Sequence, residues 1–468
     1  MRRSTRIAVA VSGAALALGA GLGAARAWEA TTTNAGLTEA AALGSHLHTR
    51  LADSWGLDLG LYAPLTVPKA SAPTLFQRLA LLEPSEGYVP DARGRQSALS
   101  WLVAGSVIEE VPGDRGRHHF YDPVHKTGLT GKGAPGGFFR RLDGTARALQ
   151  TSGTAAPDWI VSKDNDLGMA RFLTEQEAAL AAATPAEREQ HLAYALLCAG
   201  AMSAVLEDVG SPSRARDDLA EHLSPLGGGT SDRGSRFERV ASLAYGRVGV
   251  APAGMPVVRA TARDYFTSAD GKGLADVTSA HWYSSGTLPS SLLVPKQPKP
   301  GELVKRVAVT QRFAAPAPTG ELDLAGAANG GAQIHDKNGV CLADYRFEDD
   351  TLSWWISDEC AADQAGAILP NVAAYAAGFI DFLFRGNLVV EASGEIKVGT
   401  VALGAGVLTT YSEDAKGNRS PVAGGAVKVT GGAAGATLHT APSGGKLVVV
   451  FRGKDAAGED IVAAGRTK

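Results

Sequence analysis

Residues 184–218 read TPAEREQHLAYALLCAGAMSAVLEDVGSPSRARDD. Thr184 is a typical N-cap, Pro185 suits the first turn, and Glu187 completes a capping box. Apolar residues at helical spacing follow as far as Gly210, a natural helix stop. The segment therefore predicts one long helix that begins at residue 184 and ends near residue 210.

The chain around this helix has the same character from residue 28 to about residue 250. Apolar residues recur at helical spacing in TNAGLTEAAALGSHLHTRLAD, APTLFQRLALLE, QSALSWLVAGSVIEE and LTEQEAALAAA. The SRFE sequence at 235–238 has capping-box form and predicts a helix over RFERVASLAYGRV. An all-helical domain over residues 28–250 is the expected result.

The pattern changes in the second half of the chain. Residues 251–386 are expected to form an irregular segment with short strands, a disulfide loop and a buried helix over ILPNVAAYAAGFIDFLFRG. From residue 387 onward, short alternating runs such as NLVVEA and KLVVVFRG are separated by turns, which indicates an Ig-like β-sandwich over 387–468. The expected fold class is mainly α, with a small C-terminal β-sandwich.

The N-terminus has the form of a signal peptide over residues 1–27. MRRSTR is a basic start, IAVAVSGAALALGAGLGA an apolar core, and Ala25-Arg26-Ala27 a cleavage pattern. The mature chain is then expected to begin at Trp28 and to be secreted or periplasmic. The net charge of −3 gives no electrostatic reason to expect a nucleic acid or an anionic membrane as the main partner.

The chain has three cysteines. Cys341 and Cys360 flank a short loop, and in an oxidising compartment a disulfide there contributes about 3 kcal/mol through loop entropy. Cys198 lies within an apolar helical run, where a free thiol behaves as a small hydrophobe. The sequence predicts one disulfide and one inert thiol.

Several separated pieces resemble the secreted zinc-dependent phospholipase C family, whose helical fold is shared with zinc single-strand nucleases. They are the tryptophan at the expected mature N-terminus with TTTNAGLT, then AGSVIEEVPGDRGRHHFYDP, the 201–218 stretch, and SRFERVASLAYG. The resemblance covers mainly residues 28–250. It implies an all-helical fold and a zinc cluster that acts on phosphodiesters, with the amino group and carbonyl of Trp28 among the ligands.

The ligand pattern of that family is only partly present. His119 in HFYDP, Asp208 and Pro212 match, whereas Ala204 and Arg214 stand where the family has histidines. The family's histidine after the TT-type lead-in is Asn34 here, Glu110 replaces an aspartate, and Gly234 stands one turn ahead of Glu238 in place of a further histidine.

The resemblance implies metal ligands at Trp28, Glu110, His119, Asp208 and Glu238, with Glu110 also able to act as a catalytic base. Arg214 places a fixed positive charge where a cation is expected, and it is the candidate for phosphate binding. A zinc cofactor is therefore expected in an incomplete site.

Each retained residue also has an ordinary structural interpretation. Glu238 can complete a capping box, His119 can be a hydrogen-bonded fold residue, and Glu110 can be solvated. Asp208 near a helix C-terminus opposes the helix dipole and needs a basic partner, which Arg214 or Arg216 can supply. Arg214, Arg216 and Arg233 together are most often a surface ion-pair network.

Three functions remain open. The first is an exported pseudoenzyme that binds a phospholipid or phosphate-ester ligand and contacts a membrane surface, with hydrolysis weak or absent. The second is an active phosphodiesterase with a reduced metal set. The third is a secreted structural or adhesion protein. The sequence does not reveal the oligomeric state or the partner of the β-domain.

Overall fold

The computed structural model of the chain describes residues 33–80, 88–111, 115–130, 152–222, 236–248, 255–288, 331–348, 351–442 and 445–467, with short strands at 292–293, 307–308 and 321–322. The expected signal peptide, Trp28, Arg233 and Gly234 lie outside these residues.

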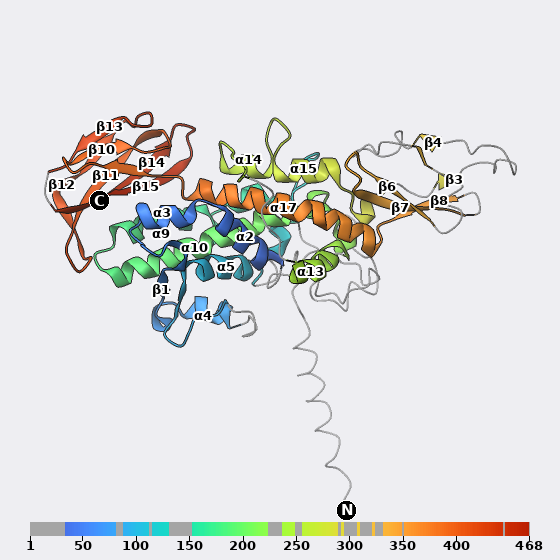
Figure 1. Cartoon of the computed structure of the whole chain (residues 1–468), viewed down its shortest axis with the longest axis horizontal. Helices are drawn as coiled ribbons and strands as arrows, with labels where there is room; N and C mark the ends of the chain where they lie inside the picture. The colour runs from blue at the N-terminus through green and yellow to red at the C-terminus, as the bar shows by residue number, and fades with distance from the viewer. Residues whose placement is uncertain are drawn as a thin grey trace, which may run out of the picture.

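The first part of the described chain is helical (Figure 1). Its α-helices are α2 (Ala35–Gly44), α3 (Leu47–Asp53), α4 (Pro73–Leu79), α5 (Ala98–Ile108), α8 (Ala156–Trp159), α9 (Met169–Ala181), α10 (Pro185–Asp208), α11 (Pro212–Ala215), α12 (Leu219–His222), α13 (Arg236–Val248), α14 (Ala262–Phe266) and α15 (Leu274–His281). Short 3-10 turns are η2 (Gly60–Tyr62), η3 (Lys69–Ser71), η5 (Arg115–His118) and η7 (Ser285–Thr287). A two-stranded antiparallel sheet, β1 (Pro64–Thr66) with β2 (Arg95–Ser97), interrupts them.

Helix α10 lies at the centre of this helical part. Thr184 and Glu187 form the capping box that the sequence predicts, and nearly every residue from Leu192 to Asp208 is buried. Because it is apolar on all sides, α10 has neighbours all round: it packs against α2, α5, α9 and the later helix α17 (Asp358–Leu383). Cys198 is buried within it, as expected, and burial raises the pKa of its thiol.

Helix α17 begins ten residues before the predicted one. The sequence was expected to be helical from Ile368, but Ser357 caps a helix by accepting a hydrogen bond from the Cys360 backbone, and Pro370 is accommodated inside it. By length and composition α17 is apolar enough to cross a membrane, yet 72% of its most apolar window is buried inside the structure. It is a core helix that packs against α2, α10 and α13.

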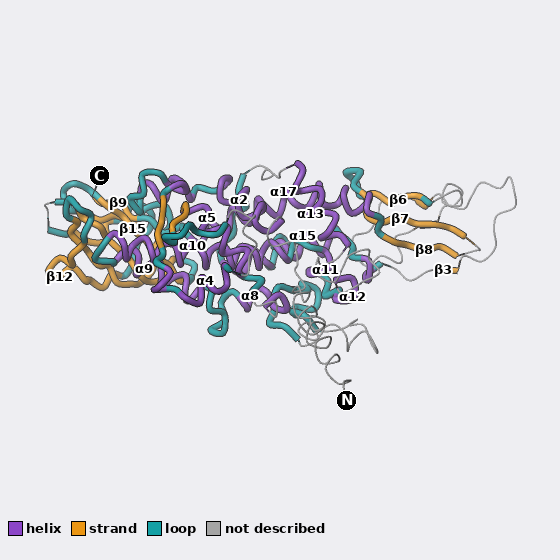
Figure 2. Tube along the Cα trace, turned by 90° about the horizontal axis from the view of Figure 1, so that it is seen from below, coloured by secondary structure: helices purple, strands orange, loops and turns teal. Residues whose placement is uncertain are grey.

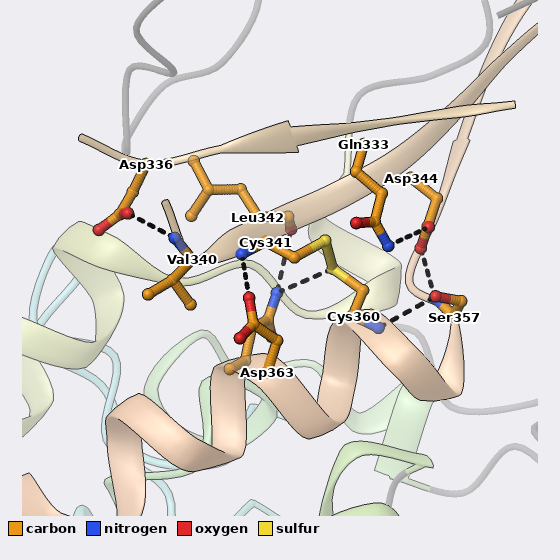
Figure 3. The surroundings of a disulfide bond; sticks show 10 residues. Gln333, Asp336, Val340, Cys341, Leu342, Asp344, Ser357, Cys360 and Asp363 are labelled. Carbon is orange, nitrogen blue, oxygen red and sulfur yellow. Dashed lines mark hydrogen bonds between the residues drawn. A yellow bond between two sulfur atoms is a disulfide. The ribbon is translucent and has the colours of Figure 1, made fainter. Parts of the chain in front are cut away.

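A small antiparallel sheet precedes α17. Its strands follow the order β3 (Leu292–Leu293), β8 (Thr351–Trp355), β7 (Cys341–Glu348) and β6 (Ala332–His335). The predicted disulfide between Cys341 and Cys360 joins β7 to the first turn of α17 (Figure 3). Asp344 beside it accepts hydrogen bonds from Gln333 and the Ser357 backbone, so this group of two cysteines and one aspartate is structural.

The C-terminal part is a β-sandwich. One sheet has the order β13 (Thr437–Thr440), β10 (Glu395–Val398), β9 (Leu388–Val390), and the other β12 (Arg419–Val429), β11 (Leu403–Glu413), β14 (Lys446–Asp455), β15 (Asp460–Arg466). All these pairings are antiparallel, and the two sheets share a separate apolar core around Ile396, Leu408 and Phe451. The expected fold class, helical and then β, is confirmed.

Figures 1 and 2 show the sandwich at one end of the molecule and the β6–β8 sheet at the other, with the helices between them. A second short pair, β4 (Val307–Ala308) with β5 (Glu321–Leu322), is also described. The Ig-like label and the exact domain boundaries remain predictions. The disulfide favours a location outside the cytoplasm, because such bonds persist in oxidising compartments.

Candidate metal centre

Two apolar helices bring their acidic C-terminal ends together. Helix α5 is followed by Glu109 and Glu110, and α10 ends at Glu207 and Asp208. The helices approach closely where a Cβ on Gly105 would lie 2.1 Å from the Leu197 carbonyl oxygen and one on Gly200 would lie 1.8 Å from that of Leu102. Only glycine allows this contact, so these two residues set the spacing of the helices.

Around these ends lies a buried cluster of charged side chains, here named the acidic centre. Its members are no more than 1% exposed, and they are Glu109, Glu110, His119, Asp208, Arg214 and Glu238. They come from the ends of α5 and α10, from the turn after η5, from α11 and from α13. Segments distant in sequence thus meet at one point.

His119 is the hub of the centre. Its Nδ1 lies 2.5 Å from Asp208 Oδ2 and 3.4 Å from Glu110 Oε1, and its Nε2 lies 3.4 Å from Glu109 Oε1. Burial alone lowers the pKa of His119, but the hydrogen bond to Asp208 and the nearby carboxylates of Glu109 and Glu110 outweigh it and raise the pKa well above its ordinary value. In the absence of a metal this raised pKa favours the protonated ring, which has three acidic side chains around it.

Glu109 has a basic partner of its own. Arg115 donates from Nη2 to Glu109 Oε2 at 2.5 Å, and the Trp159 indole donates to the other oxygen at 3.0 Å. Burial raises the pKa of Glu109, and the attraction of Arg115 and His119 more than reverses that effect. Glu109 is therefore an ionised, fully bonded carboxylate at the edge of the centre.

Arg214 lies between two other carboxylates. Its Nη1 is 3.7 Å from Asp208 Oδ2 and its Nε is 3.6 Å from Glu238 Oε1. Nη1 also donates to the Gly116 carbonyl at 3.1 Å, and the guanidinium stacks 4.8 Å from the centroid of the Phe120 ring. The positive charge that the sequence places here is enclosed, with 0% of the residue exposed.

Two serines hold Glu238 in place. Ser211 donates to Glu238 Oε1 at 2.8 Å and Ser213 lies 3.5 Å from the same oxygen. Both serines belong to the short segment that carries Arg214, so one turn of chain supplies Glu238 with its cation and its hydrogen bonds. The capping partner expected from the sequence, Ser235, lies outside the described residues.

The structure corrects two of the simpler interpretations. Glu110 is 1% exposed and therefore is not a solvated surface residue. Arg214 does not belong to a surface network with Arg216, because its guanidinium is enclosed while Arg216 donates to the carbonyls of Trp282 and Ser279. Arg214 is instead the basic partner expected for Asp208.

Glu110, His119 and Asp208 can hold a metal ion, since one donor atom from each lies within 4.8 Å of the others. Carboxylate and imidazole suit zinc. Asn34 donates from Nδ2 to Asp208 Oδ1 at 3.5 Å, and its Oδ1 is a buried acceptor with no hydrogen-bond partner among the described residues. The residues present thus fit one metal ion, with Asn34 beside it.

The same test gives a different result around Glu238. Arg214 already occupies the space between Glu238 and Asp208 with a guanidinium. A second cation there would meet a fixed positive charge at short range in a buried setting, which is strongly unfavourable. Among the described residues, the centre does not fit a metal at this second position.

One member of the acidic centre, Glu109, and two residues beside it, Arg115 and Glu207, escaped the sequence-based prediction. Glu109 and Arg115 form the bonded pair beside His119. The single Thr38 hydroxyl donates to the Glu207 carboxylate, whose two oxygens lie 2.9 and 3.1 Å from it. Burial, with the nearby Asp208, raises the pKa of Glu207 well above its ordinary value. The sequence signal for the two glutamates is a pair of acids at the end of each of two very apolar helices, Glu109-Glu110 after α5 and Glu207-Asp208 in α10.

A separate cavity of about 440 Å³ lies where α3 and α17 meet the sandwich. Its charged lining is paired: His46 with Asp381 at 2.7 Å, and Arg385 with Asp455 at 2.8 Å. Arg50 donates to carbonyls at the end of α17. No member of the acidic centre lines this cavity.

Comparison with known proteins gives distant structural matches. No family model and no curated protein matches the chain. The chain is structurally similar to the alpha toxin of Clostridium absonum, with 11% identity and a TM-score of 0.32 over 91% of this chain and 88% of that one. The alpha-toxin of an avian strain of Clostridium perfringens matches at 12% identity and a TM-score of 0.24, over 79% and 87%. These values are low, so the description of the centre rests on the chain's own residues.

Proposed function

We propose that the chain is an exported pseudoenzyme of the phospholipase C type, which binds phosphodiester or phospholipid head groups and hydrolyses them weakly or not at all. One observation carries this proposal. Arg214 is buried between Asp208 and Glu238, 3.7 and 3.6 Å from their carboxylate oxygens, where the sequence resemblance implies a metal-binding histidine. A permanent internal cation replaces part of the metal cluster.

The proposal keeps one metal position, with zinc as the expected ion. Glu110, His119 and Asp208 would hold it, and Asn34 offers a further oxygen. When bound, zinc polarises a phosphoryl oxygen and lowers the pKa of a bound water. The Trp28 terminus, implied as another ligand, belongs to the part of the chain that the structure does not describe.

The burial of the centre argues against efficient hydrolysis. Glu110, the expected base, and His119 are 1% and 0% exposed, so a head group reaches them only if the surrounding chain opens. A general base must lie within hydrogen-bond reach of the attacking water. Arg214 is equally enclosed, so its expected phosphate contact requires the same opening.

Metal content and hydrolysis of the secreted full-length protein test the proposal together. We expect up to one zinc per chain by elemental analysis, reduced by Glu110→Gln and unchanged by Glu177→Gln, a matched change at a half-exposed glutamate on α9. We also expect turnover of a chromogenic phosphocholine ester at or near background. Two or more tightly bound zinc ions per chain would contradict the proposed loss of the cluster.

The active-enzyme alternative is favoured by the proximity of Glu110, His119 and Asp208 alone. Zinc-dependent turnover well above background, abolished by Glu110→Gln, would establish it and overturn the pseudoenzyme. Phosphocholine binding is measured in parallel on the wild type and on Arg214→Met, with circular dichroism as a check of folding. Binding that persists in a folded Arg214→Met variant removes Arg214 from the head-group site.

A further inference from the structure

We infer that three arginines around Glu413, where the helical part meets the sandwich, form a binding site for a phosphoryl anion. This arginine cluster consists of Arg188, Arg419 and Arg466. It shares no residue with the acidic centre, so it stands or fails independently of the function proposed above.

The fold brings these side chains together from four elements. Arg188 is the fourth residue of α10, Glu413 ends β11, Arg419 begins β12 directly opposite Glu413, and Arg466 ends β15. Figure 1 shows the start of α10 beside the sandwich. The Arg419 backbone N–H donates to the Ala183 carbonyl at 2.8 Å, just before α10, which fixes the junction.

One carboxylate lies among the three guanidinium groups. Arg419 Nε donates to Glu413 Oε2 at 3.0 Å, and Arg466 Nη2 donates to Oε1 at 3.3 Å. Arg188 Nη2 lies 3.9 Å from Oε2. Glu189 is the next acid to act on Arg188, and its carboxylate also accepts the Thr66 backbone N–H at 3.1 Å. Three guanidinium groups thus face two carboxylates. The cluster therefore carries more positive than negative charge.

Burial makes this surplus costly. The Arg419 side chain is 1% exposed and that of Glu413 is 7% exposed, whereas Arg188 and Arg466 are 15% and 22% exposed. Like charges repel strongly where little water screens them. Burial, followed by the charge of Arg188, lowers the pKa of Arg419 to about 10. An added anion would relieve this repulsion.

Structural tethering explains only part of the arrangement. Arg188 Nη2 donates to the Gly417 carbonyl and Arg419 Nη1 to the Leu180 carbonyl, both at 2.6 Å. These bonds use one nitrogen of each guanidinium. Arg188 Nε is buried with no hydrogen-bond partner among the described residues. Anchoring the sandwich to the helices through these two carbonyls does not require three arginines around one carboxylate.

A phosphoryl group matches the cluster best. Guanidinium groups bind phosphate oxygens through paired hydrogen bonds, and phosphate as a monoanion or dianion balances a surplus of about one to two positive charges. Arg188 lies near the N-terminus of α10, where the helix dipole favours an anion and disfavours an uncompensated cation. The more exposed Arg188 and Arg466 mark the side from which the anion enters. Inorganic phosphate and a phospholipid head group share this chemistry.

The test uses the full-length exported protein and inorganic phosphate at constant ionic strength, so that general screening stays fixed. We expect saturable binding by calorimetry and a rising melting temperature. Arg188→Gln and Arg466→Gln should each weaken binding at least tenfold. The matched control is Arg452→Gln on β14, a partly exposed arginine of the same sandwich paired with Glu177.

A second arm separates the two sources of phosphate. Vesicles of phosphatidylcholine with phosphatidic acid, whose phosphate is exposed, are compared with phosphatidylcholine alone. Binding to the acidic vesicles that both arginine variants lose, with no response to inorganic phosphate, assigns the site to a lipid. If neither probe binds, or if the variants bind like the wild type and Arg452→Gln, the arginine cluster is not a phosphoryl site.

Discussion

The acidic centre and the arginine cluster are opposite in charge and differ in access to water. In the centre, four carboxylates face His119 and Arg214, Arg115 lies beside them, and the six members of the centre are closed to solvent. In the cluster, three guanidinium groups face Glu413, and Arg188 and Arg466 are partly exposed. The acidic centre therefore has more carboxylates than cations, and the arginine cluster has more cations than carboxylates.

This difference shows two ways in which a protein can balance buried charge. The centre carries its own counter-charges, Arg214 and a protonated His119, so it needs at most one ion from outside. The cluster leaves its surplus beside solvent, where a passing anion can reach it. A buried ion pair repays the cost of removing its charges from water only when its partners are well placed. Removing one partner lowers the stability more than removing both, because it leaves a buried charge without a counter-charge.

The largest expected effect comes from breaking the centre. Arg214→Met keeps much of the side-chain volume but leaves Asp208 and Glu238 without their shared cation. We expect the free energy of unfolding to fall by about 3–5 kcal/mol in urea titrations. Arg171→Met, at an exposed arginine on α9, should change it by less than about 0.5 kcal/mol. A loss below about 1 kcal/mol in Arg214→Met would mean that the centre is not balanced by this residue.

The disulfide gives a reference that does not depend on charge. Replacing Cys341 and Cys360 together with serine should lower the free energy of unfolding by about 3 kcal/mol through loop entropy. Because no charge is removed, the loss should be the same at low and high salt. A strongly salt-dependent loss would show that the bond also positions charged neighbours.

A pH titration tests whether Glu221, near Glu238 of the acidic centre, is also affected by the nearby negative charges. Burial, then the charge of Asp218, raises the pKa of Glu221 from 4.5 to about 8, and Glu238 contributes. The folded state thus holds a proton that the unfolded state releases, so the stabilisation is complete below about 4.5 and is lost as pH rises through about 8. We expect the melting temperature to fall over this range, and to fall less in Glu221→Gln. Parallel curves for the two proteins would contradict the raised pKa.

The smallest effect is expected in the arginine cluster without an anion. Arg188→Met removes one repelling charge together with one hydrogen bond to Gly417, so the free energy of unfolding should change by less than about 1 kcal/mol. Added sodium chloride should stabilise the wild type more than this variant, because salt screens the repulsion. Thermal unfolding at several salt concentrations measures both effects, and a large loss in Arg188→Met would make the residue a structural tether.

The sequence predicted the helical part well where the signal was local. Thr184 and Glu187 fixed the start of α10, and the capping-box form placed α13. The disulfide followed from the cysteine spacing. Helix α17 was predicted too short because residues 358–367 lack the long apolar run of the rest of the helix, and Pro370 suits the first turn of a helix that begins at Ile368.

Five of the six residues of the acidic centre were named from the sequence, whereas Glu109 and the burial of the whole group were not. The resemblance named Glu110, His119, Asp208, Arg214 and Glu238, and the structure brings all five together. Burial was not predictable from one sequence, since Glu110 next to Glu109 has the pattern of a solvated pair. The arginine cluster could not be predicted from the sequence, because its residues come from α10, β12 and β15 and meet only when the sandwich packs against α10.

The close approach of α5 and α10 at Gly105 and Gly200 sets the spacing of the side chains that could hold a metal ion. Neither residue has a metal-binding atom, but together they determine how near the ends of α5 and α10 lie. Zinc is bound at about 2.0–2.2 Å by oxygen and nitrogen, and calcium at about 2.3–2.6 Å by oxygen alone. The His119 nitrogen therefore favours zinc, and a methyl group at either glycine would meet a backbone carbonyl of the facing helix, push the helices apart and spoil this spacing although every ligand stayed unchanged.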